Sequence, residues 1–311
     1  MSRSQSARRG AAAAGEAAAS TAPADGAAAA SPAPAAGAPG IVFSDLDGTF
    51  VRTDKSVPER NLEALDLLAA RGIPFVPCSG RAASALPEAV VSHPACRYVI
   101  TANGASVSDL GSGEVIHGVP LDRGRCLALF ERVADRNVTF DLFADGRIFS
   151  ERARYEALKG FGLTPHEARF ILSTRTPTDL TVPEMLRRVG TLDRVTVFWR
   201  DRADRDFVVA AVEADPALSW TTSSPQNLEI SARGASKGAA LAWLCGHLGI
   251  PVGRAVAFGD MDNDVSMLEA AGDGVAVANA REEVRAHADH VCASNDEAGV
   301  GRYLEGLLAQ G

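Results

Sequence analysis

The stretch Ile41-Val42-Phe43-Ser44-Asp45-Leu46-Asp47-Gly48-Thr49 joins an apolar run directly to two carboxylates. Short apolar runs of this kind are typical of strands that are buried on both faces of a parallel sheet. Two acids this close together repel each other and are costly near a core. In open α/β sheets, ligands bind beyond the carboxyl ends of the strands, where Asp45 and Asp47 would lie. The alternative, a strand followed by a solvated Asp-Gly turn, stays open on this stretch alone.

Strand and helix patterns alternate on both sides of a middle segment that has a different character. We predict further strands at 73–78, 98–101, 254–258, 275–277 and 290–292. We predict helices at 57–71, 82–91, 237–248, 265–271, 281–288 and 299–308. This alternation predicts an α/β fold with a doubly wound parallel sheet, whose right-handed crossovers bring the strand ends to one edge.

The middle segment has the pattern of a separate, inserted α/β domain. It contains a hairpin signal at 138–149 around Asp145-Gly146, followed by a strand at 194–199 and extended chain at 218–231. Helices are predicted at 151–162, 181–189 and 204–214. We therefore divide the chain into a core, 40–120 and 230–311, and an inserted cap, 121–229. The cap carries no acidic or Cys/His cluster, so we expect it to cover the site.

Composition excludes several classes of protein. The 311 residues carry a formal charge of −8, which argues against a nucleic-acid or anionic-membrane partner. The five cysteines are scattered, so we expect a reduced, cytoplasmic protein without a zinc site. No apolar run approaches the roughly 20 residues of a membrane span. Residues 1–39 are almost entirely Ala, Gly, Ser and Pro, which predicts a disordered tail; Arg8-Arg9 only faintly suggests an export signal.

Two small clusters follow predicted strand ends or begin helices. Ser79-Gly80-Arg81 offers a hydroxyl and free backbone N–H groups, which suit a phosphate oxygen, although Ser79 could equally be an ordinary helix N-cap. Lys237 lies in the first turn of a predicted helix, where the helix dipole opposes a cation. It is either an exposed surface lysine or a cation held for an anionic substrate.

The segment Gly259-Asp260-Met261-Asp262-Asn263-Asp264 places three carboxylates in five positions after a predicted buried strand. Such a cluster requires a cation or a strong set of donors. A calcium-binding EF-hand loop needs glycine at its sixth position and glutamate at its twelfth. Those positions hold Val265 and Ala271, so this alternative fails.

These motifs, in this order, resemble the haloacid dehalogenase superfamily, specifically the Cof-type (subfamily IIB) phosphatases with an α/β C2 cap. The resemblance rests on D-L-D-G-T at 45–49, S-G-R at 79–81, N-G at 103–104, S-K-G at 236–238 and G-D-M-D-N-D at 259–264. It extends from Gly40 to the C-terminus. The cap matches only loosely, and Ser79 stands where many relatives have threonine.

The resemblance implies a role for each motif. Asp45 would be the nucleophile that forms an aspartyl-phosphate. Asp47 would be the general acid and then the general base, which requires a raised pKa. Mg²⁺ would bind Asp45, the backbone carbonyl of Asp47, and Asp260. The phosphoryl oxygens would be held by Ser79, Gly80, Lys237 and Asn263. Lys237 and Asp260 would be oriented by Asp264 and Asn263. Asn103 would lie near the junction of cap and core.

We therefore expect a Mg²⁺-dependent phosphatase that hydrolyses a small-molecule phosphate monoester, a sugar phosphate or similar metabolite. Three alternatives share the motifs: a glycosyl-phosphate phosphatase of the sucrose-phosphate or mannosyl-phosphoglycerate type, a phosphomutase, and a non-catalytic phosphate-binding protein. We expect the cap to select the substrate through segments 145–149 and 223–227. Neither the substrate nor the oligomeric state follows from the sequence.

Overall fold

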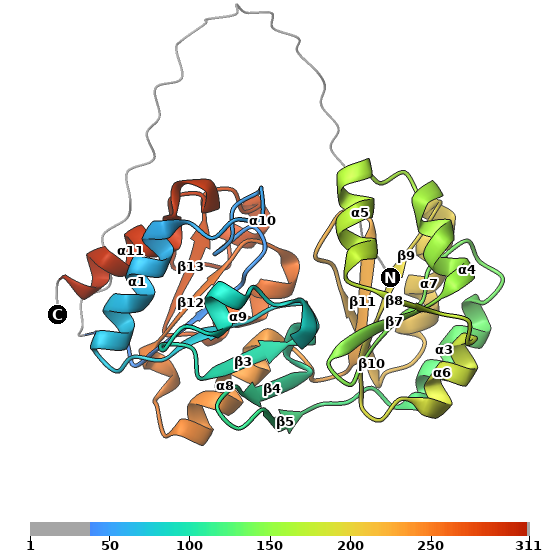
Figure 1. Ribbon diagram of the computed structural model, residues 1–311, viewed down its shortest axis with the longest axis horizontal. Helices are drawn as coiled ribbons and strands as arrows, with labels where there is room; N and C mark the ends of the chain where they lie inside the picture. Colours follow the sequence, from blue (N-terminus) through green and yellow to red (C-terminus); the bar gives the residue numbers. More distant parts are fainter. Residues whose placement is uncertain (1–37, 310–311) are drawn as a thin grey trace, which may run out of the picture.

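The computed structural model describes residues 38–309. The tail predicted to be disordered lies outside these residues except for positions 38 and 39. The described chain forms two lobes, each built on its own large sheet (Figure 1). The chain crosses between the lobes at 119–122 and at 233–236. None of the described helices is long and apolar enough to cross a membrane.

The first lobe is built on a five-stranded parallel sheet, as the alternating pattern predicted. The strand order is β14-β13-β12-β1-β2, and every neighbouring pair is parallel. Its strands are β1 (Ile41–Ser44), β2 (Phe75–Pro77), β12 (Ala255–Gly259), β13 (Asp273–Val277) and β14 (His290–Cys292). The central position of β1 explains its run of apolar residues, because both of its faces are covered.

Side chains of β1 alternate between two hydrophobic layers. Ile41 and Phe43 pack in the layer covered by α8, whereas Val42 packs in the layer covered by α1 and α11. All three side chains are fully buried, each worth about 1.5–3 kcal/mol. The helices of this lobe are α1 (Glu59–Ala70), α2 (Glu88–Val91), α8 (Lys237–Leu248), α9 (Val265–Ala270), α10 (Glu282–Arg285) and α11 (Gly299–Leu308). All five cysteines are free thiols.

Two local predictions for this lobe are wrong. The strand at 98–101 forms as β3 (Tyr98–Thr101), but it heads a separate antiparallel sheet with β4 (Ser106–Asp109) and β5 (Glu114–Gly118). A single bridge between Cys78 and Ile100 links it to the parallel sheet. The helix predicted at 82–91 is broken into a 3₁₀ turn at Ala83–Ala85 and the short helix α2. Pro87 causes the break, because the residue before a proline is driven to extended backbone.

The second lobe is the cap, with a six-stranded sheet in the order β10-β11-β9-β6-β7-β8. Its strands are β6 (Asp141–Ala144), β7 (Arg147–Glu151), β8 (Thr176–Thr178), β9 (Leu192–Phe198), β10 (Leu218–Thr221) and β11 (Asn227–Ala232). The hairpin predicted around Asp145-Gly146 is the β6–β7 turn. Helices α3 (Arg123–Val133), α6 (Val182–Arg188) and α7 (Arg202–Glu213) share one hydrophobic core with this sheet. Helices α4 (Arg152–Ala157) and α5 (Pro165–Ser173) complete the cap.

Candidate active site

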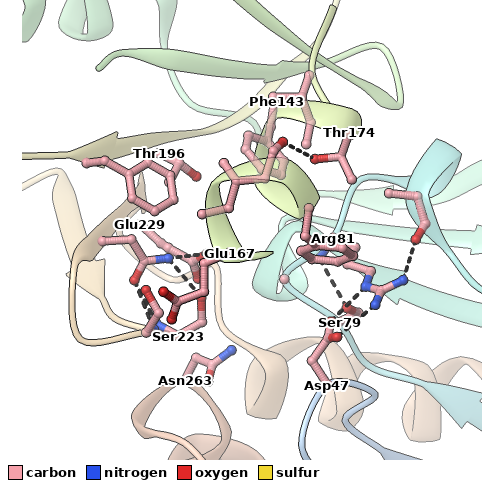
Figure 2. Close-up of a pocket in the computed structure, with 18 of the residues that line it drawn as sticks. Asp47, Ser79, Arg81, Phe143, Glu167, Thr174, Thr196, Ser223, Glu229 and Asn263 are labelled. Atoms are coloured by element: carbon pink, nitrogen blue, oxygen red, sulfur yellow. Dashed lines mark hydrogen bonds and ion pairs between the residues drawn. The ribbon is translucent and has the colours of Figure 1, made fainter. Parts of the chain in front are cut away.

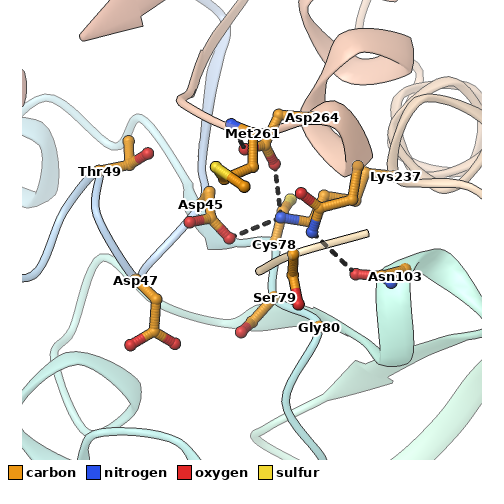
Figure 3. Close-up of polar contacts among 12 residues, drawn as sticks. Asp45, Asp47, Thr49, Cys78, Ser79, Gly80, Asn103, Lys237, Met261 and Asp264 are labelled. Carbon is orange, nitrogen blue, oxygen red and sulfur yellow. Dashed lines mark hydrogen bonds and ion pairs between the residues drawn. The ribbon is translucent and has the colours of Figure 1, made fainter. Parts of the chain in front are cut away.

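Asp45 follows β1 directly and faces a buried lysine from another element. Its backbone N–H donates to the carbonyl of Phe258 at 2.9 Å, which continues the parallel ladder with β12. Asp45 is 5% exposed, and its carboxylate accepts a 2.5 Å bond from Nζ of Lys237. Figure 3 shows both Asp45 and Asp264 directed at this ammonium group. Sequence positions that are 192 residues apart therefore meet at one sheet edge.

Lys237 is the first residue of α8 and is fully buried. The helix begins there because the Ser236 hydroxyl accepts from the backbone N–H of Ala239 at 3.1 Å, an N-cap. Nζ of Lys237 donates to Oδ1 of Asp264 at 2.6 Å as well as to Asp45. Burial alone would lower the pKa of Lys237, but the two carboxylates outweigh it and hold the pKa above its usual value. The lysine is therefore a fixed cation and not an exposed surface residue.

Asp264 and Asp260 complete the cluster. Oδ2 of Asp264 accepts from the backbone N–H groups of Asp260 and Met261, both at 3.0 Å. Oδ1 of Asp260 accepts from the Thr49 hydroxyl at 2.7 Å. Gly48 has φ +85°, and a Cβ there would lie 2.5 Å from Oδ2 of Asp260. The glycine is therefore required both for the turn and for the approach of Asp260.

The electrostatics of this cluster fit a divalent cation. One carboxylate oxygen from each of Asp45, Asp260 and Asp264 lies within 4.8 Å of the others. Burial, with the charge of Asp264, raises the pKa of Asp260 to about 7, and burial raises the pKa of Asp45 well above its usual value. Three buried carboxylates face the single ammonium of Lys237, which leaves about two negative charges uncompensated. Hard oxygen ligands with this excess charge suit Mg²⁺. Asp264 already accepts three donors, so Asp45 and Asp260 are the side chains with capacity for the ion.

Asp47 departs from the expectation drawn from its sequence. Its carboxylate accepts two 2.7 Å bonds from the Arg81 guanidinium and one of 2.9 Å from Nζ of Lys55. Burial alone would raise the pKa of Asp47, but Arg81 and then Lys55 lower it to about 2. The raised pKa predicted for a general acid is therefore wrong for this arrangement, because the sequence motif did not reveal two neighbouring cations. The carboxylate also points away from Lys237 (Figure 3), so its side chain takes no part in the acid cluster.

Three of the predicted phosphate-binding residues, Ser79, Gly80 and Asn263, line the same cavity as Asp45. Ser79 is 1% exposed, and its Oγ accepts from the backbone N–H of Arg81 at 3.1 Å. Asn103 has left-handed backbone, φ 58°, and its Oδ1 accepts from Nδ2 of Asn263 at 3.2 Å. Oδ1 of Asn263 is buried without a partner in the described part of the chain. A Cβ on Gly80 would meet Oδ1 of Asn103 at 2.9 Å. Gly80 and Asn263 thus both lie next to Asn103, and Ser79 directly precedes Gly80; that they hold a phosphoryl group stays a prediction.

The sequence reasoning missed a group of buried charges in the cap. Arg194 of β9 is 2% exposed and lies 3.1 Å from Oε1 of Glu229 on β11. The Arg194 guanidinium also donates to the carbonyl of Gly80, and Nδ2 of Asn103 donates to Oε2 of Glu229 at 2.5 Å. The cap is therefore joined to the core at the predicted phosphate loop. The available signal was the alternation along β9, in which Val195 and Val197 pack in the cap core. The positions between and beside them, which hold Arg194, Thr196 and Phe198, line the cavity.

A cavity of about 300 Å³ lies between the lobes (Figure 2). The core lines it with Asp45, Asp47, Ser79, Gly80 and Asn263. The cap contributes Ile148 from the predicted hairpin segment, and Ser223, Ser224 and Asn227 from the predicted loop. Figure 2 places Phe143 and Thr196 at one end and Asp47, Ser79 and Asn263 at the other.

Comparisons with known proteins agree with this architecture. A model of the haloacid dehalogenase-like hydrolase family matches residues 42–304. Phosphatase YwpJ of Bacillus subtilis (strain 168) is 29% identical over 292 residues, covering 86% of this chain and 99% of that protein. Pyridoxal phosphate phosphatase YbhA of Escherichia coli (strain K12) is 25% identical over 270 residues, covering 85% and 97%. The solved structure of a haloacid dehalogenase-like hydrolase from B. subtilis has a TM-score of 0.75 at 28% identity, covering 86% of this chain and 99% of that one.

Proposed function

The chain belongs to the haloacid dehalogenase-like hydrolases, and on that premise we propose that it is a Mg²⁺-dependent phosphatase of small-molecule phosphate monoesters. The observation that carries the proposal is the excess of buried carboxylate at the end of β1, next to a cavity of about 300 Å³ between the lobes. The relatives named above are phosphatases, one of them for pyridoxal phosphate. Mg²⁺, when bound, supplies positive charge that neutralises the phosphoryl oxygens and the nucleophile.

The first half-reaction is the transfer of the phosphoryl group to Asp45. A carboxylate oxygen of Asp45 attacks phosphorus, the bond from phosphorus to the ester oxygen breaks, and an aspartyl-phosphate forms. Lys237 is fully buried and fixed by Asp264, so its charge is oriented before the substrate arrives. The hydroxyl of Ser79 and the backbone of Gly80 face the same cavity and bind the phosphoryl oxygens.

Asp47 transfers a proton in each half-reaction. It gives a proton to the departing alcohol, then takes one from the water that attacks phosphorus and releases inorganic phosphate. The bidentate contact with Arg81 opposes the protonated form of Asp47. An anionic phosphoryl group competes for the guanidinium of Arg81 and for the ammonium of Lys55, so we propose that substrate draws both cations from Asp47 and allows its acid role.

The cavity volume of about 300 Å³ is at the lower end of the range of about 300–1,000 Å³ for small-molecule sites, which supports a small monoester as substrate. The volume does not separate this function from that of the glycosyl-phosphate phosphatases. The fixed charges of the cluster equally support a phosphomutase, which returns the phosphoryl group to its substrate.

The test is to follow the phosphoryl group. The protein with Mg²⁺ should release inorganic phosphate from a panel of ³²P-labelled monoesters, and acid-quenched protein should carry label that hydroxylamine removes. Asp45→Asn should carry none. Return of the label to a second position of a sugar would identify a mutase. Phosphate binding without turnover of any ester would support the non-catalytic alternative.

A further inference from the structure

Three consecutive residues between β3 and β4 have a left-handed backbone. Their φ angles are 50° at Ala102, 58° at Asn103 and 92° at Gly104, and all three residues are buried. A residue with a Cβ atom disfavours this conformation, and two of the three residues carry one. Strain of this kind persists only where the surrounding structure holds it, and it is common beside functional sites. The contacts around the turn 102–104 therefore determine its conformation.

The turn is hydrogen-bonded to the predicted phosphate loop, 79–81. The backbone N–H of Asn103 donates to the carbonyl of Ser79, and that of Ala102 donates to the carbonyl of Arg81, both at 3.1 Å. A Cβ on Gly80 would lie 2.9 Å from Oδ1 of Asn103, so another residue there would displace that amide. The position of the loop therefore depends on the turn.

The same turn packs against the start of α8. A Cβ on Gly104 would lie 2.1 Å from the carbonyl oxygen of Ser236, the N-cap of the helix that begins with Lys237. Because a Cβ atom cannot come this close to backbone, the packing requires glycine. The loop 79–81 and the helix that carries Lys237 thus both contact one turn.

The side-chain amide of Asn103 joins the cap to the acid-rich loop after β12. Its Nδ2 donates to Oε2 of Glu229 at 2.5 Å, and its Oδ1 accepts from Nδ2 of Asn263 at 3.2 Å (Figure 3). An amide supplies both a donor and an acceptor, whereas a carboxylate supplies only acceptors. The carboxylate of Glu229 therefore fixes which way the Asn103 amide faces, and Asn103 in turn fixes the amide of Asn263.

Glu229 is held in place by cap side chains. It is 3% exposed, and its Oε1 lies 3.1 Å from Nη1 of Arg194. The same oxygen accepts from the hydroxyl of Ser223 at 2.9 Å and from Nδ2 of Asn227 at 3.3 Å. With Oε1 bonded within the cap, Oε2 is the atom that binds the core. The cap acid therefore acts on the turn through a single amide.

Resting on the phosphatase function above, we propose that Asn103 is a positioning residue for phosphoryl binding. Glu229 of the cap orients Asn103, which orients Asn263 and the loop 79–81. Asn103 is not among the residues that line the cavity, so it acts through those that do. Docking of the cap and binding of phosphate are then energetically linked, and a change at Glu229 reaches the phosphate only when the Asn103 amide is present.

Asn103→Gly tests the amide while keeping the left-handed backbone, which glycine adopts readily. With Mg²⁺ and p-nitrophenyl phosphate, kcat/KM should fall by about 10- to 100-fold, as expected for misplaced active-site groups. The inhibition constant (Ki) of inorganic phosphate should rise by about threefold to tenfold, the value of about one hydrogen bond. Unchanged kcat/KM and Ki would overturn the proposal. A wild type that neither hydrolyses this ester nor binds phosphate would instead refute the phosphatase function.

Asn61→Ala is the matched control. It removes an equally buried amide from α1, whose Nδ2 donates to the carbonyl of Phe50 and whose Oδ1 accepts from the N–H of Gly301, both at 2.8 Å. This asparagine does not line the cavity, so its loss should lower the melting temperature and leave Ki for phosphate unchanged. An equal rise of Ki in both variants would show general destabilisation and contradict a positioning role for Asn103.

Exchanging donor and acceptor tests the link to the cap, and it decides the matter even if Asn103→Gly fails to fold. Asn103→Asp opposes two carboxylates and should weaken phosphate binding. Asn103→Asp/Glu229→Gln restores the bond in the reverse direction at the same net charge, and the new carboxylate still accepts from Asn263. The double variant should bind inorganic phosphate about threefold or more tighter than Asn103→Asp, a usual coupling between contacting residues. Recovery of the melting temperature without recovery of Ki would contradict the proposal.

Discussion

The core and the cap each bury a cluster of charges, but the two clusters are balanced differently. In the core, Asp45 and Asp264 bind the ammonium of Lys237, and a third buried acid, Asp260, lies beside them. In the cap, Arg194 pairs with Glu229 at 3.1 Å, and a second buried arginine, Arg175, pairs with Asp141 at 3.1 Å. Each of these four cap charges therefore has a partner of opposite sign, whereas the core cluster retains an excess of negative charge.

The difference separates charges that await a ligand from charges that hold the protein together. An uncompensated buried carboxylate is stable only when another cation arrives or a proton is taken up. A one-to-one pair needs no ligand to balance its charges, and the protein is strongly destabilised when one partner is removed, because the other charge is then buried alone. The core cluster should therefore respond to metal and affect turnover, and the cap cluster should affect stability.

The largest expected effect is the loss of turnover in Asp45→Asn. The amide keeps the shape of the side chain and can still accept from Lys237, but it cannot attack phosphorus. We expect kcat to fall by about 10⁴-fold or more, with the melting temperature (Tm) kept within a few degrees. Steady-state phosphate release and thermal unfolding would measure the two quantities. Substantial remaining activity would remove Asp45 from the proposed nucleophile role.

Removal of divalent metal should have the next largest effect. Excess chelator should reduce phosphate release to background, and added Mg²⁺ should restore it. Mg²⁺ should also raise the Tm of the wild type, because an ion that binds only the folded state stabilises it. Asp260→Asn should reduce that rise, and Arg194→Met, in the balanced cap cluster, should not. Full activity in chelator would mean that donors within the protein alone balance the acids.

Breaking the Arg194–Glu229 pair should lower the free energy of unfolding without changing the response of Tm to Mg²⁺. Arg194→Met leaves the carboxylate of Glu229 buried without its cation, which should cost about 3–5 kcal/mol of unfolding free energy. The double variant Arg194→Met/Glu229→Gln should recover part of this loss. Arg125→Met removes an exposed cap arginine paired with Asp215 at 2.7 Å and should change denaturant unfolding far less. Equal losses for the two arginine variants would show that burial does not distinguish the pairs.

The smallest expected effect concerns Asp193, a cap acid next to the balanced pair. Burial raises its pKa to about 6, although Arg194 opposes this. The unfolded value is about 3.9, so the folded state binds the proton more tightly, and the resulting stabilisation is lost as pH rises from about 4 to 6. The Tm of Asp193→Asn should therefore be a few degrees above that of the wild type at pH 7, and the two should have the same Tm at pH 4. The exposed control Asp201→Asn should show no such pH dependence; a matching shift there would rule out burial as the cause.

The core could be predicted from the sequence because short contiguous motifs specify its strands and turns. The run Ile41–Phe43 is apolar throughout because both faces of β1 are covered, and glycines mark the turns that bring Asp45 and Asp260 together. The predicted residues Asp45, Lys237, Asp260 and Asp264 do meet in the structure. Their catalytic roles stay predictions until the experiments above are done.

The contacts that the sequence did not reveal are those made between separate elements. Arg81 and Lys55 reach Asp47 from two different loops and reverse the expected direction of its pKa. The partners Arg194 and Glu229 lie in strands whose other residues are mostly apolar, and their pairing depends on the register of β9 against β11. Strand β3 could be located but not assigned to its sheet, since its partner β4 was not predicted.

The position of β1 between β2 and β12 has a consequence for the nascent chain. β12 begins 211 residues after β1 ends, and the whole cap sheet lies between them in the sequence. At translation rates of about 5–20 residues per second, β12, the second neighbour of β1, is synthesised roughly 10–40 s after β1. The cap sheet, continuous from β6 to β11, emerges from the ribosome complete in that interval. Asp260 and Asp264 arrive only afterwards, so the polypeptide cannot assemble the acid cluster until synthesis is nearly finished.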